Sequence, residues 1–138
     1  MYTKKVKYED YLGETHEENV SFNLTKIEML KFQTSVEGGL DKYIEKLQKE
    51  NDPIKMVLFF DMFVKAAYGK ISDDGSRFIK SKELTEDFSQ SAAYDTLFSQ
   101  IISDPNLIQE FLIGCVPKEF KSQITAEMNK QAALTSAE

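Results

Sequence analysis

The segment from Tyr68 to Phe98 reads YGKISDDGSRFIKSKELTEDFSQSAAYDTLF and holds more structural information than any other part of the chain. Gly69 ends the apolar helix before it, and the SDDG run at 72–75 has turn chemistry, with a glycine that can adopt positive φ. Ser81 can cap a helix that runs to about Ser89, where a cluster of serines favours a break. The pattern predicts a turn followed by two aromatic-rich helices, without a plausible catalytic set.

Start signals and apolar periodicity predict helices on both sides of this segment. Thr25 stands three residues before Glu28, which is the spacing of a capping box. Asp52-Pro53 and Asp104-Pro105 each pair a capping aspartate with a proline in the first helical turn. The helix at 54–68 is apolar nearly all round, so we expect it to be buried in the centre of the domain. Apolar residues expected to face the core are Ile27, Leu30 and Phe32; Leu40, Tyr43, Ile44 and Leu47, in a helix that ends near Asn51; Leu84 and Phe88; Tyr94, Leu97, Phe98, Ile101 and Ile102; and Leu107, Ile108, Phe111, Leu112 and Cys115.

The first 24 residues have the alternating pattern of a β-hairpin. Val6 and Tyr8 alternate with lysines, and Val20, Phe22 and Leu24 alternate with polar residues after a polar loop. An isolated hairpin is marginal in water, so this one must pack on the helices, pair with another strand, or order with a partner. We therefore predict a mainly α protein, a small bundle of about five to six helices with an N-terminal β-hairpin. Its predicted parts are a hairpin arm at 1–24, a helical domain at 25–120 and a weakly structured tail at 121–138.

Composition narrows the classes of function. The 138 residues fit one domain, and the net charge of −6 lacks the basic stripe that nucleic acids and anionic membrane surfaces attract. Cys115 is the single cysteine, which excludes an intramolecular disulfide and fits a reducing cytoplasm. The most apolar segment is too short to span a membrane and carries charged residues. We expect neither a nucleic-acid partner nor a membrane partner.

Candidate catalytic and metal-binding patterns are weak. His16 is the only histidine, so it and Cys115 cannot supply the four ligands of a structural zinc site, and a Cys–His nucleophile pair would need the fold to bring them together. With Gly75 at position six of a calcium loop, Lys70 and Ser81 occupy the two ligand ends, so the match fails. Phosphate-binding glycine loops are missing, and acid pairs leave carboxylate catalysis open only in principle. We predict a protein that is not an enzyme, with no cofactor and no metal.

An ordered set of motifs spans about residues 53–120. A Tyr-Gly pair ends an apolar helix, a Ser-x-Asp-Gly-x-x-Phe-x-Lys turn follows, and a Phe-x-x-x-x-Ala-Tyr-x-x-Leu-Phe element precedes a helix that ends in a hydrophobic-Pro pair. The motif residues are Tyr68, Gly69, Ser72, Asp74, Gly75, Phe78, Lys80, Phe88, Ala93, Tyr94, Leu97, Phe98, Val116 and Pro117. In this set the chain resembles the tail assembly chaperones of long-tailed, non-contractile (siphovirus-type) bacteriophages.

The resemblance implies a role in the assembly of the viral tail. Such proteins are implied to bind the tape measure protein, to keep it soluble, and to help the tail tube (major tail) protein polymerise around it. It also implies a location in the host bacterial cytoplasm, absence from the mature virion, and a longer form made by a programmed translational frameshift. The alternatives are a structural virion protein, such as a tail completion or connector protein, and a helical DNA-binding regulator, which the acidic charge disfavours. Self-association stays open, because a hairpin edge or an apolar strip can pair with a second copy.

A chaperone for a coiled, apolar client needs helices that present apolar strips. The carboxy-terminal helix is the candidate partner-binding surface, because Ile113 and Val116 lie off the main stripe of that helix. The candidate contact residues are Phe111, Leu112, Ile113 and Val116. The alternative interpretation is that all four side chains belong to the core.

Overall fold

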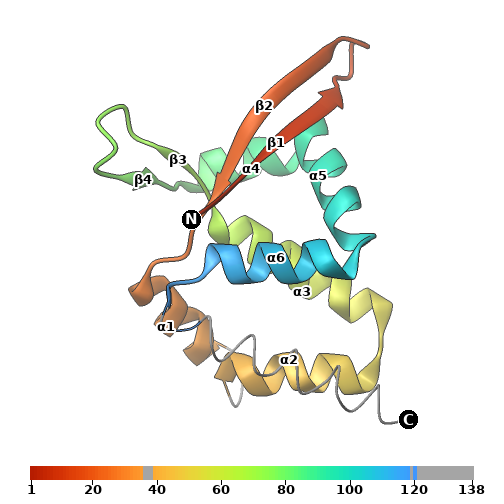
Figure 1. Cartoon of the computed structure of the whole chain (residues 1–138), viewed down its shortest axis with the longest axis vertical. Coiled ribbons are helices and arrows are strands. Elements are labelled where there is room, and N and C mark those ends of the chain that lie inside the picture. The colour runs from red at the N-terminus through yellow and green to blue at the C-terminus, as the bar shows by residue number, and fades with distance from the viewer. Residues whose placement is uncertain (36–38, 119, 121–138) are drawn as a thin grey trace.

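The computed structural model describes residues 1–35, 39–118 and 120, and within them the chain forms six helices and four strands (Figure 1). A sheet and a set of helices share one core, so the fold is α+β. In chain order the elements are β1 (Tyr2–Glu9), β2 (Thr15–Phe22), α1 (Lys26–Ser35), α2 (Gly39–Glu50), α3 (Pro53–Ala67), β3 (Tyr68–Ile71), β4 (Phe78–Ile79), α4 (Lys82–Ser89), α5 (Ala92–Ile102) and α6 (Pro105–Cys115).

The prediction of a mainly α bundle is wrong, because the hairpin is half of a four-stranded antiparallel sheet. The strand order is β1-β2-β3-β4, and β2 joins β3 through the pairs Ser21↔Gly69 and Phe22↔Tyr68. The segment that contains β3 and β4 was predicted as a turn between helices. Strands of four and two residues are too short to show an alternating pattern. β3 pairs with β4 and also with β2, which lies far away in the sequence.

The predicted N-terminal hairpin is confirmed. β1 and β2 pair in unbroken register from Tyr2↔Phe22 to Glu9↔Thr15. Even-numbered residues of both strands share one side of the ribbon, and Val6 and Phe22 are fully buried there, whereas Glu18 remains exposed. On the opposite face the Lys5 ammonium lies 2.7 Å from the Glu17 carboxylate. The period-two pattern therefore set both the pairing and the buried face of this ribbon.

The predicted helix caps are also confirmed. Thr25 and Glu28 form the reciprocal capping box, with the Thr25 amide donating to Glu28 Oε1 at 3.0 Å and the Glu28 amide donating to Thr25 Oγ1 at 3.2 Å. Such caps satisfy amide groups that the first helical turn leaves without partners. Side-chain oxygens also cap the N-termini of four other helices: Asp52 caps α3, Ser81 caps α4, Ser91 caps α5 and Asp104 caps α6.

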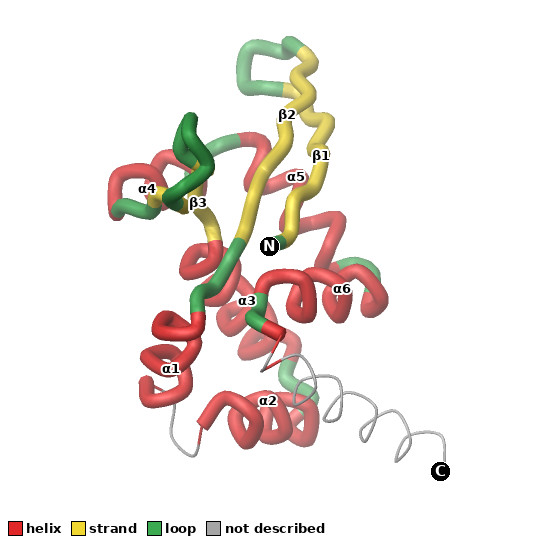
Figure 2. The backbone as a smooth tube through the Cα atoms, turned by 60° about the vertical axis from the view of Figure 1, so that its left-hand side comes forward, coloured by secondary structure: helices red, strands yellow, loops and turns green. Residues whose placement is uncertain are grey.

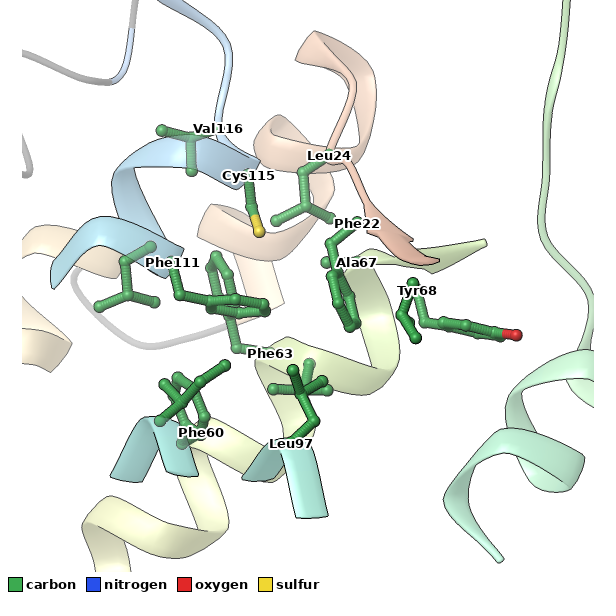
Figure 3. Packing of buried hydrophobic residues seen from close by; sticks show 14 of the residues in the cluster. Phe22, Leu24, Phe60, Phe63, Ala67, Tyr68, Leu97, Phe111, Cys115 and Val116 are labelled. Atoms are coloured by element: carbon green, nitrogen blue, oxygen red, sulfur yellow. The ribbon is translucent and has the colours of Figure 1, made fainter. Parts of the chain in front are cut away.

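The core is an aromatic cluster where α3, α5, α6 and the sheet meet (Figure 3). Phe111 of α6 lies at its centre, with its ring centroid 5.0 Å from that of Phe22 and 5.3 Å from that of Phe60. Phe63 is 6.0 Å from the same ring, and all of these pairs have edge-to-face geometry. Edge-to-face packing adds a directional contribution to the burial of large apolar side chains. Leu97 of α5 is fully buried beside this cluster.

Two burial predictions for the helices are wrong. α1 buries Met29, whereas Ile27 and Leu30 are 65% and 51% exposed. α1 reaches α3 through Phe32, whose ring packs on Phe59 and Phe63, so only a narrow face of α1 is covered. Likewise α3 buries one face and leaves the other exposed. The side chains of Leu40 and Ile44 and the tail at 121–138 lie outside what the structure describes, as does the end of the first helix, which Gly38-Gly39 predicts near Val36.

Among the described residues, no helix combines the length and the apolar character required to cross a membrane.

Removing the central ring tests this description of the core. We expect Phe111→Ala to lower the free energy of unfolding by about 3–5 kcal/mol, because it deletes a buried aromatic side chain and leaves a cavity. Urea denaturation followed by circular dichroism measures the change. Leu58→Ala is the matched control, since that side chain is 63% exposed and its loss should cost less than about 0.5 kcal/mol. Equal losses in the two variants would contradict the assignment of Phe111 to the core.

Candidate interaction surface

The motif turn between β3 and β4 is held by Asp74. Its carboxylate accepts hydrogen bonds from the Ser72 hydroxyl at 2.7 Å, the Ser76 amide at 3.0 Å and the Ser76 hydroxyl at 2.8 Å. These donors favour the ionised form and hold the pKa of Asp74 at about 2. Gly75 has φ +75°, a conformation that suits glycine. These contacts explain the turn as a structural connection between β3 and β4.

Gly69 is required by the packing of that hairpin. A Cβ atom at this position would lie 2.5 Å from Cε1 of Phe78 and 2.8 Å from the carbonyl oxygen of Ile79. Both distances are shorter than real carbon contacts, so a side chain would push β4 away from β3. The Phe78 ring in turn faces the Lys80 ammonium, which lies 5.7 Å from the ring centroid. The two motif residues therefore bring Lys80 into position.

Lys80 joins three elements at one point. Its ammonium donates to the Asn23 carbonyl at 2.7 Å, the Ala66 carbonyl at 2.8 Å and Glu28 Oε2 at 2.7 Å. These acceptors come from the end of β2, the last turn of α3 and the first turn of α1. The Ala66 carbonyl belongs to a helix C-terminus, where the backbone dipole favours a positive charge. Burial alone would raise the pKa of Glu28, but hydrogen bonds from Lys80 and the Thr25 amide lower it overall.

The aromatic motif residues fill the space between the sheet, α4 and α5. The rings of Tyr68 and Phe88 stack with centroids 4.0 Å apart and an angle of 5° between their planes. Tyr94 meets Phe88 edge-on, and its hydroxyl donates to Asp61 of α3. Tyr68, Phe88 and Tyr94 therefore pack β3, α4, α5 and α3 against one another.

The carboxy-terminal helix turns most of its predicted contact residues inward. Phe111, Leu112 and Val116 are 0%, 5% and 2% exposed, and Ile113 is partly buried against the core. Figure 3 shows Phe111 and Val116 among the core side chains. A partner can reach a buried side chain only if the helix leaves the core. Contact between these four residues and a client therefore stays a prediction, and a different surface is freely accessible.

That accessible surface lies on α3, and we call it the α3 face. Ile54 is 71% exposed, Leu58 63%, and Val57 and Met62 41% each. Ile54, Leu58 and Met62 recur every four residues, so they form a ridge about 12 Å long at 1.5 Å rise per residue. The apolar pattern of this helix did not predict the exposed face, because apolar residues occur on nearly all of its sides. The sequence does contain a signal for the exposed face, which is the uneven distribution of large side chains around the helix. The aromatic residues of α3 all lie on the opposite, buried face.

The charged neighbours of the α3 face are already paired. Lys55 lies 2.7 Å from Glu50, and Lys65 lies 2.9 Å from Asp61. Each of these two lysines is therefore balanced by an acidic partner beside the apolar ridge. Recognition by the α3 face is therefore expected to depend on apolar contact rather than on charge.

The titratable residues near the hairpin tip form a structural cluster. Asp10, Glu14 and His16 have potential ligand atoms within 4.8 Å of one another. However, Asp10 Oδ1 accepts hydrogen bonds from the Leu12 and Glu14 amides, and its Oδ2 lies 2.6 Å from His16 Nε2. These bonds account for the cluster as a turn connection.

Cys115 and His16 occupy separate parts of the molecule. Cys115 is buried at the end of α6, and desolvation raises the pKa of its thiol far above the usual range. His16 stacks on Tyr8 near the hairpin tip, which lies away from α6 in both views (Figures 1 and 2). The fold does not bring these two residues together as a nucleophile and its base.

Replacing Lys80 tests its role as a joint. We expect Lys80→Met to lower the free energy of unfolding by about 1–3 kcal/mol, because two carbonyls and a carboxylate lose their partner. Lys82→Met is the matched control, since its side chain is 91% exposed and its nearest acid, Glu86, is 3.9 Å away. Urea denaturation of both variants at neutral pH provides the measurement. A Lys82 variant as unstable as the Lys80 variant would refute this role.

The lowered pKa of Glu28 predicts a pH dependence of stability. The folded-state pKa lies below the ordinary value of 4.5, so the carboxylate stabilises the fold above about pH 4.5. This contribution is lost as the pH falls through the folded-state pKa. We expect the stability difference between the wild type and Glu28→Gln to be largest at neutral pH and to shrink in acid. Thermal unfolding from pH 7 to pH 3 measures it, and a constant difference would exclude this linkage.

Comparison with known proteins identifies the family. A family model described as phage tail assembly chaperone matches residues 1–138, the whole chain. No curated protein and no solved structure matches the chain. The match includes the N-terminal hairpin, for which the sequence motifs offered no assignment. The chain therefore belongs to the phage tail assembly chaperone family.

Proposed function

We propose that this protein is a non-catalytic chaperone that binds the tape measure protein, keeps it soluble and promotes polymerisation of the tail tube protein around it. The observation that carries the proposal is the exposed α3 face on a member of a tail assembly chaperone family. An amphipathic client helix can lay its own apolar stripe along this ridge, and rows of residues four apart are a common element of helix packing. The partner is thus a long helical protein rather than a small ligand.

The size of the α3 face favours weak, repeated binding. Fully burying a side chain of this kind contributes about 1.5–3 kcal/mol, and these four side chains are already partly covered. Ordering the client offsets part of that gain, so one copy holds one client segment only weakly. Many copies along a long client still cover it. Weak individual contacts also allow tail tube subunits to displace the chaperone.

The proposal places the protein in the host bacterial cytoplasm and excludes it from the mature virion. A chaperone displaced by the tail tube does not become part of the particle, whereas a completion or connector protein does. Mass spectrometry of purified virions separates these two functions. The longer frameshifted form implied by the sequence resemblance stays a prediction, which immunoblotting of infected cells can check.

Co-expression with the tape measure protein tests the proposed contact. We expect Leu58→Asp to reduce the soluble fraction of the tape measure protein at least fivefold, because a carboxylate in the middle of the ridge must be desolvated on binding. The melting temperature of the variant should remain within a few degrees of the wild type, since Leu58 is exposed. The soluble client is measured by quantitative immunoblotting after centrifugation.

Two further variants introduce an aspartate at apolar positions outside the α3 face. Leu12→Asp changes an 89% exposed leucine in the hairpin turn and should leave client solubility unchanged. Ile113→Asp tests α6 in the same assay, where loss of client solubility with a native circular dichroism spectrum would support contact through that helix. Full client solubility with Leu58→Asp would rule out the α3 face as the binding surface.

A further inference from the structure

A groove of about 690 Å³ opens where β2 and β3 separate. The two strands pair only through Ser21↔Gly69 and Phe22↔Tyr68, after which β2 continues to the hairpin tip and β3 turns toward β4 (Figure 2). α4 and the start of α5 complete the lining of the groove. It lies at the sheet, and none of the four residues of the α3 face contributes to it.

One wall of the groove is an open strand edge. The Asn23 amide donates to the Ala67 carbonyl at 2.8 Å, which extends the β2–β3 ladder by one step. Because backbone groups alternate sides along a strand, the odd-numbered residues of β2 direct their amide and carbonyl toward β3. Even-numbered residues of β2 use theirs to pair with β1. Among the described residues, the outward backbone groups of Glu17 and Asn19 bond to no strand.

The side chains that line the groove indicate which residues a strand added to this edge would need. Val20, Leu84 and Phe88 provide apolar surface, and Glu18 and Asp87 provide two carboxylates. Burial, followed by the charges of Glu18 and Asp87, raises the pKa of Tyr68, so both carboxylates act on the same hydroxyl. Asp87 forms no salt bridge in the part of the chain that the structure describes. Among the described residues that line the groove, Lys70 is the single cation beside the two carboxylates, which leaves the groove acidic.

We propose that this groove binds an extended peptide segment of a partner protein, which adds as a strand to the free edge of β2 and places a lysine or arginine side chain near Glu18 and Asp87. Strand addition supplies backbone hydrogen bonds, while the acidic and apolar groups select alternate side chains of the peptide. A second copy of this chain is a poor occupant. Pairing β2 with β2 would bring Glu17 and Glu18 of both copies together, and like charges destabilise cross-strand contacts.

This inference does not depend on the proposed function, because it concerns a different surface and an extended rather than a helical partner. The experiment uses a displayed library of random dodecapeptides selected on the immobilised full-length chain. The most enriched peptide is then synthesised with a fluorescent label and titrated by fluorescence anisotropy. We expect it to contain lysine or arginine among alternating apolar residues. Failure to enrich any peptide, or enrichment of acidic peptides, would overturn the proposal.

Variants then locate the bound peptide. Asn19→Pro removes an outward amide that the β1–β2 ladder does not use. Asp87→Lys reverses the charge of an exposed side chain in the groove. Each variant should weaken binding of the peptide at least tenfold. Asn19→Ala keeps the amide and Leu58→Asp alters the α3 face, so both should bind within twofold of the wild type. Loss of binding with Leu58→Asp would instead assign the peptide to the α3 face.

Amide hydrogen exchange provides a measurement that needs no variant. Addition of the peptide to the wild-type protein should slow exchange at the Glu17 and Asn19 amides at least tenfold, because each gains a hydrogen-bond partner. Unchanged exchange at both amides would overturn strand addition even if Asn19→Pro failed to fold.

Discussion

Packing around the ring of Phe22 is the contact on which the rest of the structure depends. Phe22 is the last residue of β2 and is fully buried. Its ring lies 5.0 Å from Phe111 of α6 and 6.0 Å from both Tyr68 and Phe88, measured between centroids. The same residue pairs with Tyr68 in the sheet, so one position links the hairpin, β3, α4 and α6. Next to Phe22, the Lys80 ammonium adds a polar contact by donating a hydrogen bond to the Asn23 carbonyl.

This arrangement gives several of the recognisable motif residues a structural role. Gly69, Asp74 and Lys80 shape a tight hairpin and anchor it to three elements. Binding to another protein depends on the groups that folding leaves without partners. Here these are an apolar helix face and an open strand edge, which lie on different elements.

The two surfaces suit two kinds of partner. The α3 face has two lysines paired with acids beside it and favours a helix with an apolar stripe, whereas the groove beside β2 has unpaired backbone groups and an acidic lining. None of the four residues of the α3 face lines the groove, so the two surfaces are separate.

Local interactions were readable from the sequence, and long-range ones were not. The capping box at Thr25 and Glu28 involves residues three apart, and the hairpin register follows from alternation, so a short window of sequence contains the necessary information. The family motifs were readable for the same reason, since they are short and ordered. The α+β architecture was missed because β3 and β4 are short, and because β3 joins the hairpin through Ser21 and Phe22, which lie far away in the sequence.

Burial of the apolar helices was likewise decided by the tertiary structure. α3 offers apolar residues on all sides, and packing by α1, α5 and α6 covers Phe59, Phe60 and Phe63 while leaving Ile54 and Leu58 in water. α6 shows the converse, since its candidate contact residues Phe111 and Leu112 are buried. The sequence alone determined which segments are helices, where they start, and that the protein resembles a tail assembly chaperone. Only the tertiary structure decided which apolar faces remain exposed, because exposure depends on the elements that pack against a face and not on the residues within it.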